Sequence, residues 1–190
     1  MPFTVITNVS VLALEIGKQT GILVAASTPP PPPGLKDKWR WLQCTLKNET
    51  QFKIQLLDSY FNSGRYWDSP KDVDPFTQMV FSCCNDDGSI LTGVAGGTAF
   101  RVILNESVHY DFAVGWTNPA AGSLKASIVP GSRGVYGYES ANPDGSSFMD
   151  DTVYEAKDGD GNPVQFKLHF SGAAGQEAMF VVKEIVLTST

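Results

Sequence analysis

The side chains of this chain that are able to do catalysis are few, and they do not fall into a catalytic pattern. Two histidines, His109 and His169, lie in stretches that alternate like strands. The sequence contains no GxSxG nucleophile elbow, no HExxH zinc motif and no phosphate-binding P-loop. Neighbouring carboxylates such as Asp150 and Asp151 occur where a turn is expected. We therefore expect that the protein is not an enzyme and has no cofactor.

Residues able to bind a metal are equally sparse. The run from Asp158 through Asp160 to Asn162 starts like a calcium loop, but Pro163 follows where the loop needs glycine, and the distal glutamate is missing. The three cysteines are odd in number, two of them are adjacent, and no CxxC pair is present: Cys44, Cys83 and Cys84. We expect a hairpin tip at residues 158–162, buried thiols and no metal site.

The composition describes a folded domain with an acidic surface. The chain has 190 residues, of which 42% are hydrophobic and 18% charged, as in an ordinary globular domain. Its net charge is −6 and its sequence pI is near 4.8. No excess of basic residues is available to displace counterions from nucleic acid or to attract anionic lipid. Nucleic acid is therefore not an expected partner.

Near its start the chain has an apolar segment, residues 8–26. Five consecutive prolines separate this segment from the rest of the chain. Proline fixes φ and lacks an amide donor, so neither a helix nor a sheet continues through such a run. We divide the chain into an N-terminal segment with its proline linker, residues 1–34, and a body, residues 35–190. Helical spacing places six apolar residues of the segment on one face: Val9, Leu12, Ala13, Ile16, Leu23 and Val24. A docked helix or an edge strand is the alternative.

The same segment does not look like a signal peptide or a permanent membrane span. Glu15, Lys18 and Gln19 interrupt its apolar run, and no basic stretch precedes it. We therefore expect no cleavage and no constitutive transmembrane helix.

The body consists of short apolar stretches separated by turn residues at intervals of roughly 8–12 residues. This pattern predicts a mainly β protein, a single antiparallel β-sandwich with one or two short flanking helices. Residues 105–107 are expected to form a hairpin turn, and the polar residues 142–151 a loop or a short helix. The predicted strands span 39–46, 52–57, 78–82, 98–104, 109–116, 123–129, 153–156, 164–170 and 180–187.

Several short motifs in the body resemble the actinoporin family of pore-forming cytolysins. Residues 46–50 (LKNET) are similar to a family strand that ends in Asn-x-(Ser/Thr), and residues 57–64 (LDSYFNSG) to its Tyr-Phe-x-Ser-Gly turn. Residues 92–96 (TGVAG) follow, then 112–116 (FAVGW), and Thr117-Asn118-Pro119 is similar to the family's Phe-Ser-Val-Pro loop. The motifs keep the family's order and spacing.

The resemblance implies that the N-terminal segment leaves the sandwich, lies on a membrane and lines an oligomeric pore. The expected partners are a membrane lipid headgroup or a cell-surface glycan, and further copies of the chain. The resemblance carries the headgroup site over to Ser63, Ala95, Thr117 and Pro119, with aromatic side chains contributed by Tyr136 and Tyr138 and by Tyr66 and Trp67.

One departure from the family concerns the loop after Pro119. The family has a loop rich in tyrosine and tryptophan there, whereas this chain reads Ala120-Ala121-Gly122-Ser123. Each lost ring removes about 0.5–2 kcal/mol of cation–π attraction for a quaternary ammonium. We therefore expect tight phosphocholine binding to be lost at this place.

Two other functions remain open. Fungal fruit-body lectins share this sandwich, and Tyr66, Trp67 and Trp116 are the aromatic residues that we expect to stack on a sugar. The other alternative is a soluble interaction protein that keeps only the scaffold. In the cytolysin interpretation the protein is soluble and acts at target-cell membranes, either secreted or stored in the cytosol without a signal peptide.

Overall fold

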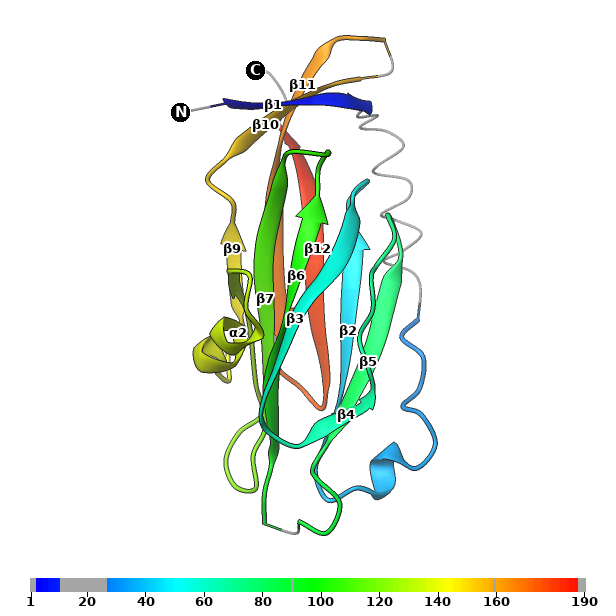
Figure 1. Cartoon of the computed structure of the whole chain (residues 1–190), viewed down its shortest axis with the longest axis vertical. Helices are drawn as coiled ribbons and strands as arrows, with labels where there is room; N and C mark the ends of the chain where they lie inside the picture. Colours follow the sequence, from blue (N-terminus) through cyan, green and yellow to red (C-terminus); the bar gives the residue numbers. More distant parts are fainter. Residues whose placement is uncertain (1–2, 11–26, 90, 159, 188–190) are drawn as a thin grey trace.

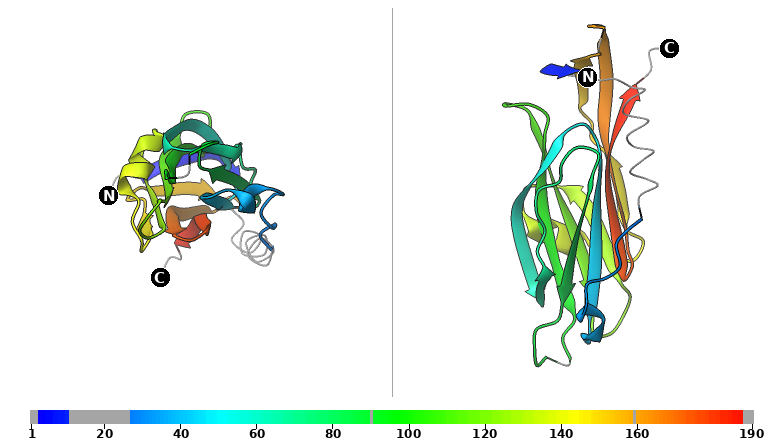
Figure 2. Two further views of the ribbon diagram at one scale, coloured as in Figure 1. Left: turned by 90° about the horizontal axis from the view of Figure 1, so that it is seen from below. Right: turned by 90° about the vertical axis from the view of Figure 1, so that its right-hand side faces the viewer.

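Alternating apolar residues along the strands bury one face of each of two sheets, and these faces meet to form the core (Figure 1). The computed structural model describes residues 3–10, 27–89, 91–158 and 160–187. Seen end-on, the two sheets form two layers (Figure 2). The predicted mainly β sandwich is confirmed.

The larger sheet, sheet A, has the strand order β1-β10-β11-β12-β2-β5-β4, and β9 also pairs with β11. Two of its pairs are parallel, β1 with β10 and β12 with β2, and the others are antiparallel. Its strands are β1 (Phe3–Ser10), β2 (Trp41–Glu49), β4 (Arg65–Asp68), β5 (Gln78–Cys84), β9 (Ser146–Met149), β10 (Val153–Lys157), β11 (Pro163–Ala173) and β12 (Glu177–Leu187).

The smaller sheet, sheet B, is antiparallel throughout, with the order β3-β6-β7-β8. Its strands are β3 (Lys53–Ser63), β6 (Val94–Ile103), β7 (His109–Asn118) and β8 (Lys125–Pro130). Aromatic side chains from both sheets dominate the core between them. The largest fully buried side chains include Trp116, Phe81, Phe100, Phe112, Phe166, Phe170 and Phe180.

Both predicted hairpin turns are present. Ile103 is the register partner of His109, so residues 104–108 form the turn between β6 and β7. Between β10 and β11, the Asp158 carboxylate accepts hydrogen bonds from the backbone N–H groups of Asp160 and Asn162, at 2.9 and 2.8 Å. The Asp158 side chain, which would be a metal ligand in a calcium loop, therefore stabilises the turn through hydrogen bonds to the backbone.

Short helical turns flank the sandwich, as predicted, but not all at the expected place. A 3-10 turn, η1 (Leu35–Asp37), follows the prolines, and a helix, α2 (Gly134–Ser140), packs on sheet B. The stretch 142–151, which we expected to form a loop or a short helix, contains β9 instead. Phe148 explains this difference, because its ring stacks on Phe170 at 4.7 Å between centroids while the backbone of β9 pairs with β11.

The predicted helix from Asn8 is wrong at its start, because residues 3–10 form the strand β1. Val9, predicted on the membrane-inserting face of that helix, therefore lies in a strand. Pairing with the edge of β10 explains the difference, since it satisfies backbone groups that a helix would have bonded internally. Leu12, Ala13, Ile16, Leu23 and Val24 lie outside the described residues.

The proline linker is tied to the outer face of sheet A. The Gln78 side chain of β5 donates a hydrogen bond to the carbonyl of Ser27 at 3.1 Å, and Gln43 of β2 donates to the carbonyl of Pro29 at 2.9 Å. The chain on either side of residues 11–26 is thus attached to the same sheet, by β1 before them and by these two bonds after them.

Candidate functional site

Five of the residues predicted at the headgroup site line one open hollow of about 500 Å³. The hollow lies at the end of sheet B where β3 and β7 finish and β6 begins, and residues of α2 also line it. Its predicted members are Ser63, Ala95, Thr117, Pro119 and Tyr138, and the other residues around it are Asn62, Gly93, Ala120, Lys125, Glu139 and Ala141.

The register of sheet B arranges four of these residues in a row. Ser63 pairs with Ala95, Ala95 with Thr117, and Thr117 with Lys125 across the strands β3, β6, β7 and β8. Directly opposed residues of antiparallel strands point to the same face of a sheet, so this row forms the floor of the hollow. Residues far apart in sequence are thereby brought together by strand pairing alone.

The hollow combines both signs of charge with neutral donors. Ser63 and Thr117 offer hydroxyl groups and Asn62 an amide. Lys125 and Glu139 are exposed and carry charges of opposite sign, and neither has an ion-pair partner among the described residues. This set of side chains suits a ligand that carries an anionic group and a cationic group a short distance apart.

Close glycine packing brings α2 to the hollow. A Cβ atom on Gly97 would overlap the carbonyl oxygen of Gly134, and one on Gly115 would overlap that of Gly137. The helix therefore lies directly on the backbones of β6 and β7. Ser127 also fixes it, because its hydroxyl donates to the Gly137 carbonyl at 2.6 Å. Tyr138 and Glu139 reach the hollow because of these contacts.

The aromatic ring at the hollow is supported by a neighbour. Tyr138 lies 5.4 Å from Tyr60 between ring centroids, at an interplanar angle of 43°. Tyr136, the other predicted tyrosine of this helix, is 42% exposed and does not line the hollow. The structure therefore places one of the two predicted tyrosines at the site.

An arginine that the sequence analysis did not single out fixes the loop at the rim. The Arg40 guanidinium donates to the carbonyls of Pro119 and Ala120, at 2.8 Å each. Its Cζ also lies 4.7 Å from the centroid of the Trp39 ring. These contacts couple the chain before β2 to the loop after β7.

Two exposed apolar side chains, also missed, lie next to this rim. Trp39 is 52% exposed and precedes Arg40, and Leu91 is 85% exposed and lies two residues before Gly93 of the hollow. The sequence signal that could have indicated an exposed Trp39 is the run Trp39-Arg40-Trp41, in which only Trp41 belongs to a strand. Leu91 belongs, with Ile90, to a pair of apolar residues after the polar turn at residues 85–88, and two residues are too few to give a pattern.

The three aromatic residues expected to stack on a sugar do not form one platform. Trp116 is fully buried and packs against Phe81 at 5.1 Å, so the prediction that it meets a sugar is wrong. Its position on β7 points it into the core, together with Phe112 and Val114. No ring face of Trp116 is left for a ligand.

Tyr66 and Trp67 are each engaged elsewhere. The Tyr66 hydroxyl lies 2.8 Å from Ser59 Oγ and 2.7 Å from Thr98 Oγ1, and burial raises the pKa of Tyr66 to about 12. Trp67 lies beside two cations, with Lys38 Nζ at 5.3 Å and Arg65 Cζ at 5.8 Å from its ring centroid. Neither residue lines the hollow.

Within the described residues, no group of three or more His, Cys, Asp or Glu side chains is placed to bind a metal ion. The three cysteines are buried and free. Burial raises the pKa of the Cys83 thiol well above its usual value. Among the helices described, none has the length and apolar character needed to cross a membrane.

Comparisons with known proteins bear on the fold. No protein-family model matches the sequence, and no curated protein sequence matches it. The structure is similar to the crystal structure of the lipid-binding protein Nakanori, with a TM-score of 0.51 and 15% sequence identity. The alignment covers 90% of this chain and 79% of the other. At this identity the likeness shows a shared fold, in agreement with the sandwich that the sequence predicted.

Proposed function

We propose that the protein binds membrane lipids, with a headgroup in the hollow and with Trp39 and Leu91 in the membrane interface beside it. The observation that carries this proposal is the row Ser63–Ala95–Thr117–Lys125, which Tyr138 and Glu139 of α2 complete on one side. The lipid-binding neighbour of the same fold is consistent with it.

The charges of the hollow favour a zwitterionic headgroup. A phosphate group would accept hydrogen bonds from Ser63 and Thr117 and pair with the Lys125 ammonium. An amine or alkylammonium at the other end of the headgroup would face the Glu139 carboxylate and the Tyr138 ring. The net charge of −6 disfavours a strongly anionic membrane. A single ring in place of an aromatic loop implies modest affinity per headgroup.

The exposed apolar side chains at the rim add membrane affinity that a free headgroup would not receive. Burying a side chain such as leucine is worth about 1.5–3 kcal/mol when it was exposed before. Tryptophan favours the membrane–water interface because its ring is apolar and its N–H is polar. Arg40 supports both functions, since it holds the rim loop and lies against Trp39.

Pore formation is the finer part of the proposal, and it rests on the actinoporin-like motifs of the body. Insertion of the N-terminal segment would require one strand pairing and two hydrogen bonds to break. The strand β1 must leave β10, and Gln78 and Gln43 must release the carbonyls of Ser27 and Pro29. Further copies of the chain would then be needed to enclose an aqueous path.

Co-sedimentation with phosphatidylcholine vesicles tests the binding step. We expect Lys125→Gln and Thr117→Val each to weaken binding by about tenfold, which corresponds to the loss of one charge-assisted or polar contact of about 1.4 kcal/mol. Lys157→Gln is the matched control, because Lys157 is an exposed lysine of β10 outside the hollow. Equal binding by all four proteins would refute the proposed site.

Dye release from the same vesicles reports on the pore step. Val5 and Glu155 are register partners of β1 and β10, so the double variant Val5→Cys, Glu155→Cys allows the strands to be cross-linked. We expect the oxidised variant to bind vesicles without releasing dye, and reduction to restore release. A wild-type protein that binds but never releases dye would leave lipid binding standing and refute pore formation. Binding to glycans with no binding to vesicles would favour the lectin alternative.

A further inference from the structure

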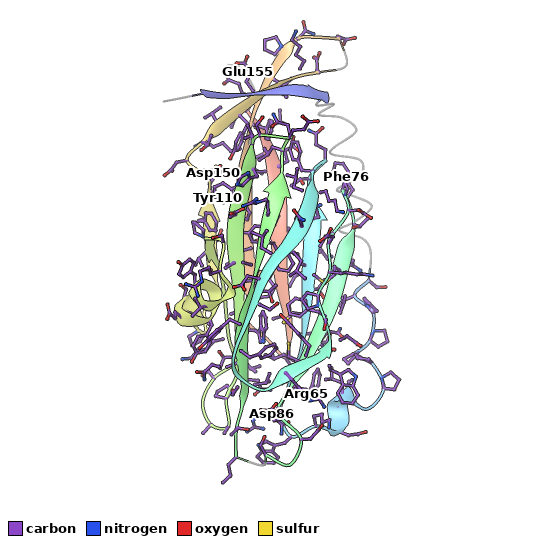
Figure 3. All side chains as sticks on the ribbon, viewed as in Figure 1. Arg65, Phe76, Asp86, Tyr110, Asp150 and Glu155 are labelled. Carbon is purple, nitrogen blue, oxygen red and sulfur yellow. The ribbon has the colours of Figure 1, made fainter. Side chains whose placement is uncertain are left out.

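A second pocket, of about 400 Å³, shares no residue with the hollow. It lies where β8, an edge strand of sheet B, faces β9 of sheet A. Tyr110 and Asp150, labelled in Figure 3, lie next to each other at this pocket. Its lining consists of Tyr110, Ile128 to Pro130 and Ser146 to Asp151.

The two strands at the pocket are fixed to each other by one side chain. The Ser146 hydroxyl accepts a hydrogen bond from the Ile128 N–H at 2.7 Å and donates one to the Ile128 carbonyl at 2.8 Å. This pair of hydrogen bonds joins the edge strand β8 to β9 at one end of the pocket. The pocket is therefore part of the rigid sandwich.

Two half-buried aromatic rings form the apolar part of the lining. Tyr110 lies 6.4 Å from Phe148 between ring centroids, and each ring packs on Phe170 below, at 5.1 and 4.7 Å. The contacts with Phe170 fix both rings in place. The rings of Tyr110 and Phe148 are partly exposed, and both belong to the lining of the pocket.

The polar part of the lining is acidic. Asp150 is only 5% exposed, and its carboxylate accepts hydrogen bonds from the Thr152 N–H at 3.0 Å and from the Tyr154 hydroxyl. Asp151 beside it is exposed. In the described part of the chain, no lysine or arginine lies within ion-pair distance of either carboxylate. The two hydrogen bonds stabilise the Asp150 carboxylate inside the protein, whereas no described cation balances its charge or that of Asp151.

The other basic side chains nearby are engaged with partners of their own. Arg101 is held by Asp111 in two hydrogen bonds of 2.7 and 2.8 Å, on the strand positions next to Tyr110. His169 Nε2 contacts Ser147 Oγ at 3.0 Å. Burial, and then the charges of Asp150 and Asp151, raise the pKa of Tyr110 to about 12, so both carboxylates act on the ring that lines the pocket.

We propose that this pocket binds a small organic cation of the alkylammonium class. Its charge is balanced by Asp150 and Asp151, and its alkyl groups contact the faces of Tyr110 and Phe148 through cation–π and apolar contacts. The site is independent of the hollow, because no residue is common to both. The cation is either free or the terminal group of a lipid.

Calorimetric titration with choline chloride tests this site, with the neutral isostere 3,3-dimethylbutan-1-ol as the matched ligand. We expect choline to bind the full chain and the alcohol to bind at least about tenfold more weakly, since it has the same shape without the charge. Asp151→Asn is expected to weaken choline binding by about tenfold. The matched control is Asp144→Asn, an exposed acid of the preceding turn outside this pocket.

Three results would overturn the proposal: no choline binding, equal binding of the alcohol, or a loss of choline binding in Tyr138→Leu but not in Asp151→Asn. The third would place choline in the hollow. Binding to phosphatidylcholine vesicles then distinguishes the source of the cation. If Asp151→Asn weakens vesicle binding as well as choline binding, the cation belongs to a lipid, and if it weakens only choline binding, the cation is free.

Discussion

Glu184 of β12 links the stability of the protein to pH. The side chain is 4% exposed, and its carboxylate accepts a hydrogen bond from Gln51 Nε2 at 2.8 Å. Burial raises its pKa from 4.5 to about 7, although the bonds from Gln51 act in the opposite direction. Between these values the folded state keeps a proton that the unfolded chain has lost. The stability from this group is therefore fully present below pH 4.5 and is lost as the pH rises through about 7.

We expect Glu184→Gln to remove this dependence, because an amide does not titrate. For the wild type, the contribution of this group to the free energy of unfolding should fall by roughly 3 kcal/mol between pH 4.5 and pH 8. Urea unfolding of both proteins across this range measures the difference. Glu177→Gln on the same strand is the control, since Glu177 is exposed. Parallel stability curves for wild type and Glu184→Gln would contradict the assignment.

Residues of the hollow could be predicted from the sequence when they belong to a short motif. Residues that reach the hollow only through strand pairing could not. Ser63, Ala95, Thr117 and Pro119 belong to short runs of sequence that resemble a family, and all four line the hollow. Lys125 has no such signal, because it joins them only through its pairing with Thr117. The prediction that Trp116 meets a sugar was wrong, although the alternation of residues 112–116 indicates a side chain that points into the core.

Among the elements, α2 is a helix that its local sequence does not favour and that tertiary packing stabilises. Its seven residues, GVYGYES, include two glycines and have no side-chain cap. The same glycines allow the close approach to Gly97 and Gly115 that holds the helix on sheet B. Sequence reasoning predicted short flanking helices but missed the place of this one, because the glycines that let it pack, Gly97 of β6 and Gly115 of β7, lie on two other elements.

We expect Gly115→Ala to damage both stability and lipid binding. The added methyl group would overlap the carbonyl of Gly137, so α2 would have to move and take Tyr138 and Glu139 away from the hollow. A loss of about 1–3 kcal/mol in the free energy of unfolding is typical of overpacking. Thermal unfolding and vesicle co-sedimentation measure the two effects.

Gly175→Ala is the matched control for this substitution. A Cβ atom at Gly175 would meet no atom closer than 3.6 Å. If Gly115→Ala behaved like Gly175→Ala in both measurements, the close packing of α2 would not be what positions the hollow.

The start of the chain shows the limit of periodicity for short apolar runs. The residues from Val9 onward fit helical spacing and also a partly alternating strand, so the sequence leaves an edge strand open as the alternative. The structure has a strand at Phe3–Ser10 because β10 offers an unpaired edge. The availability of that edge is a property of the folded sheet.

For the molecule as a whole, the net charge should set the choice of membrane. With a charge of −6, the protein is repelled by an anionic surface, and salt screens that repulsion over a Debye length of about 8 Å at 0.15 M. We expect weak binding to phosphatidylglycerol vesicles that increases when salt is raised from about 0.01 M to about 0.15 M. Binding to phosphatidylcholine vesicles should change little. A decrease of binding to anionic vesicles with salt would indicate instead that the cations near the rim dominate.

The fold class was predictable from the spacing of turns and apolar runs, whereas the order of the strands was not. Each of the nine predicted strands overlaps a strand of the structure. Alternation identifies the buried face of a strand but does not say which strand lies next to it. The pairing of β12 with β2, from widely separated parts of the sequence, therefore has no local signal.

The place of β12 in sheet A has a consequence for synthesis on the ribosome. It lies between β11 and β2 and follows the other described strands in the sequence. While the chain is being made, β2 and β5 can pair with each other, but the far edge of β2 stays open until residues 177–183 have left the exit tunnel. Sheet B needs none of those residues for its own strand pairs, so it can form earlier. A nascent chain stalled before β12 would expose an unpaired strand edge, which is the surface that chaperones protect from aggregation.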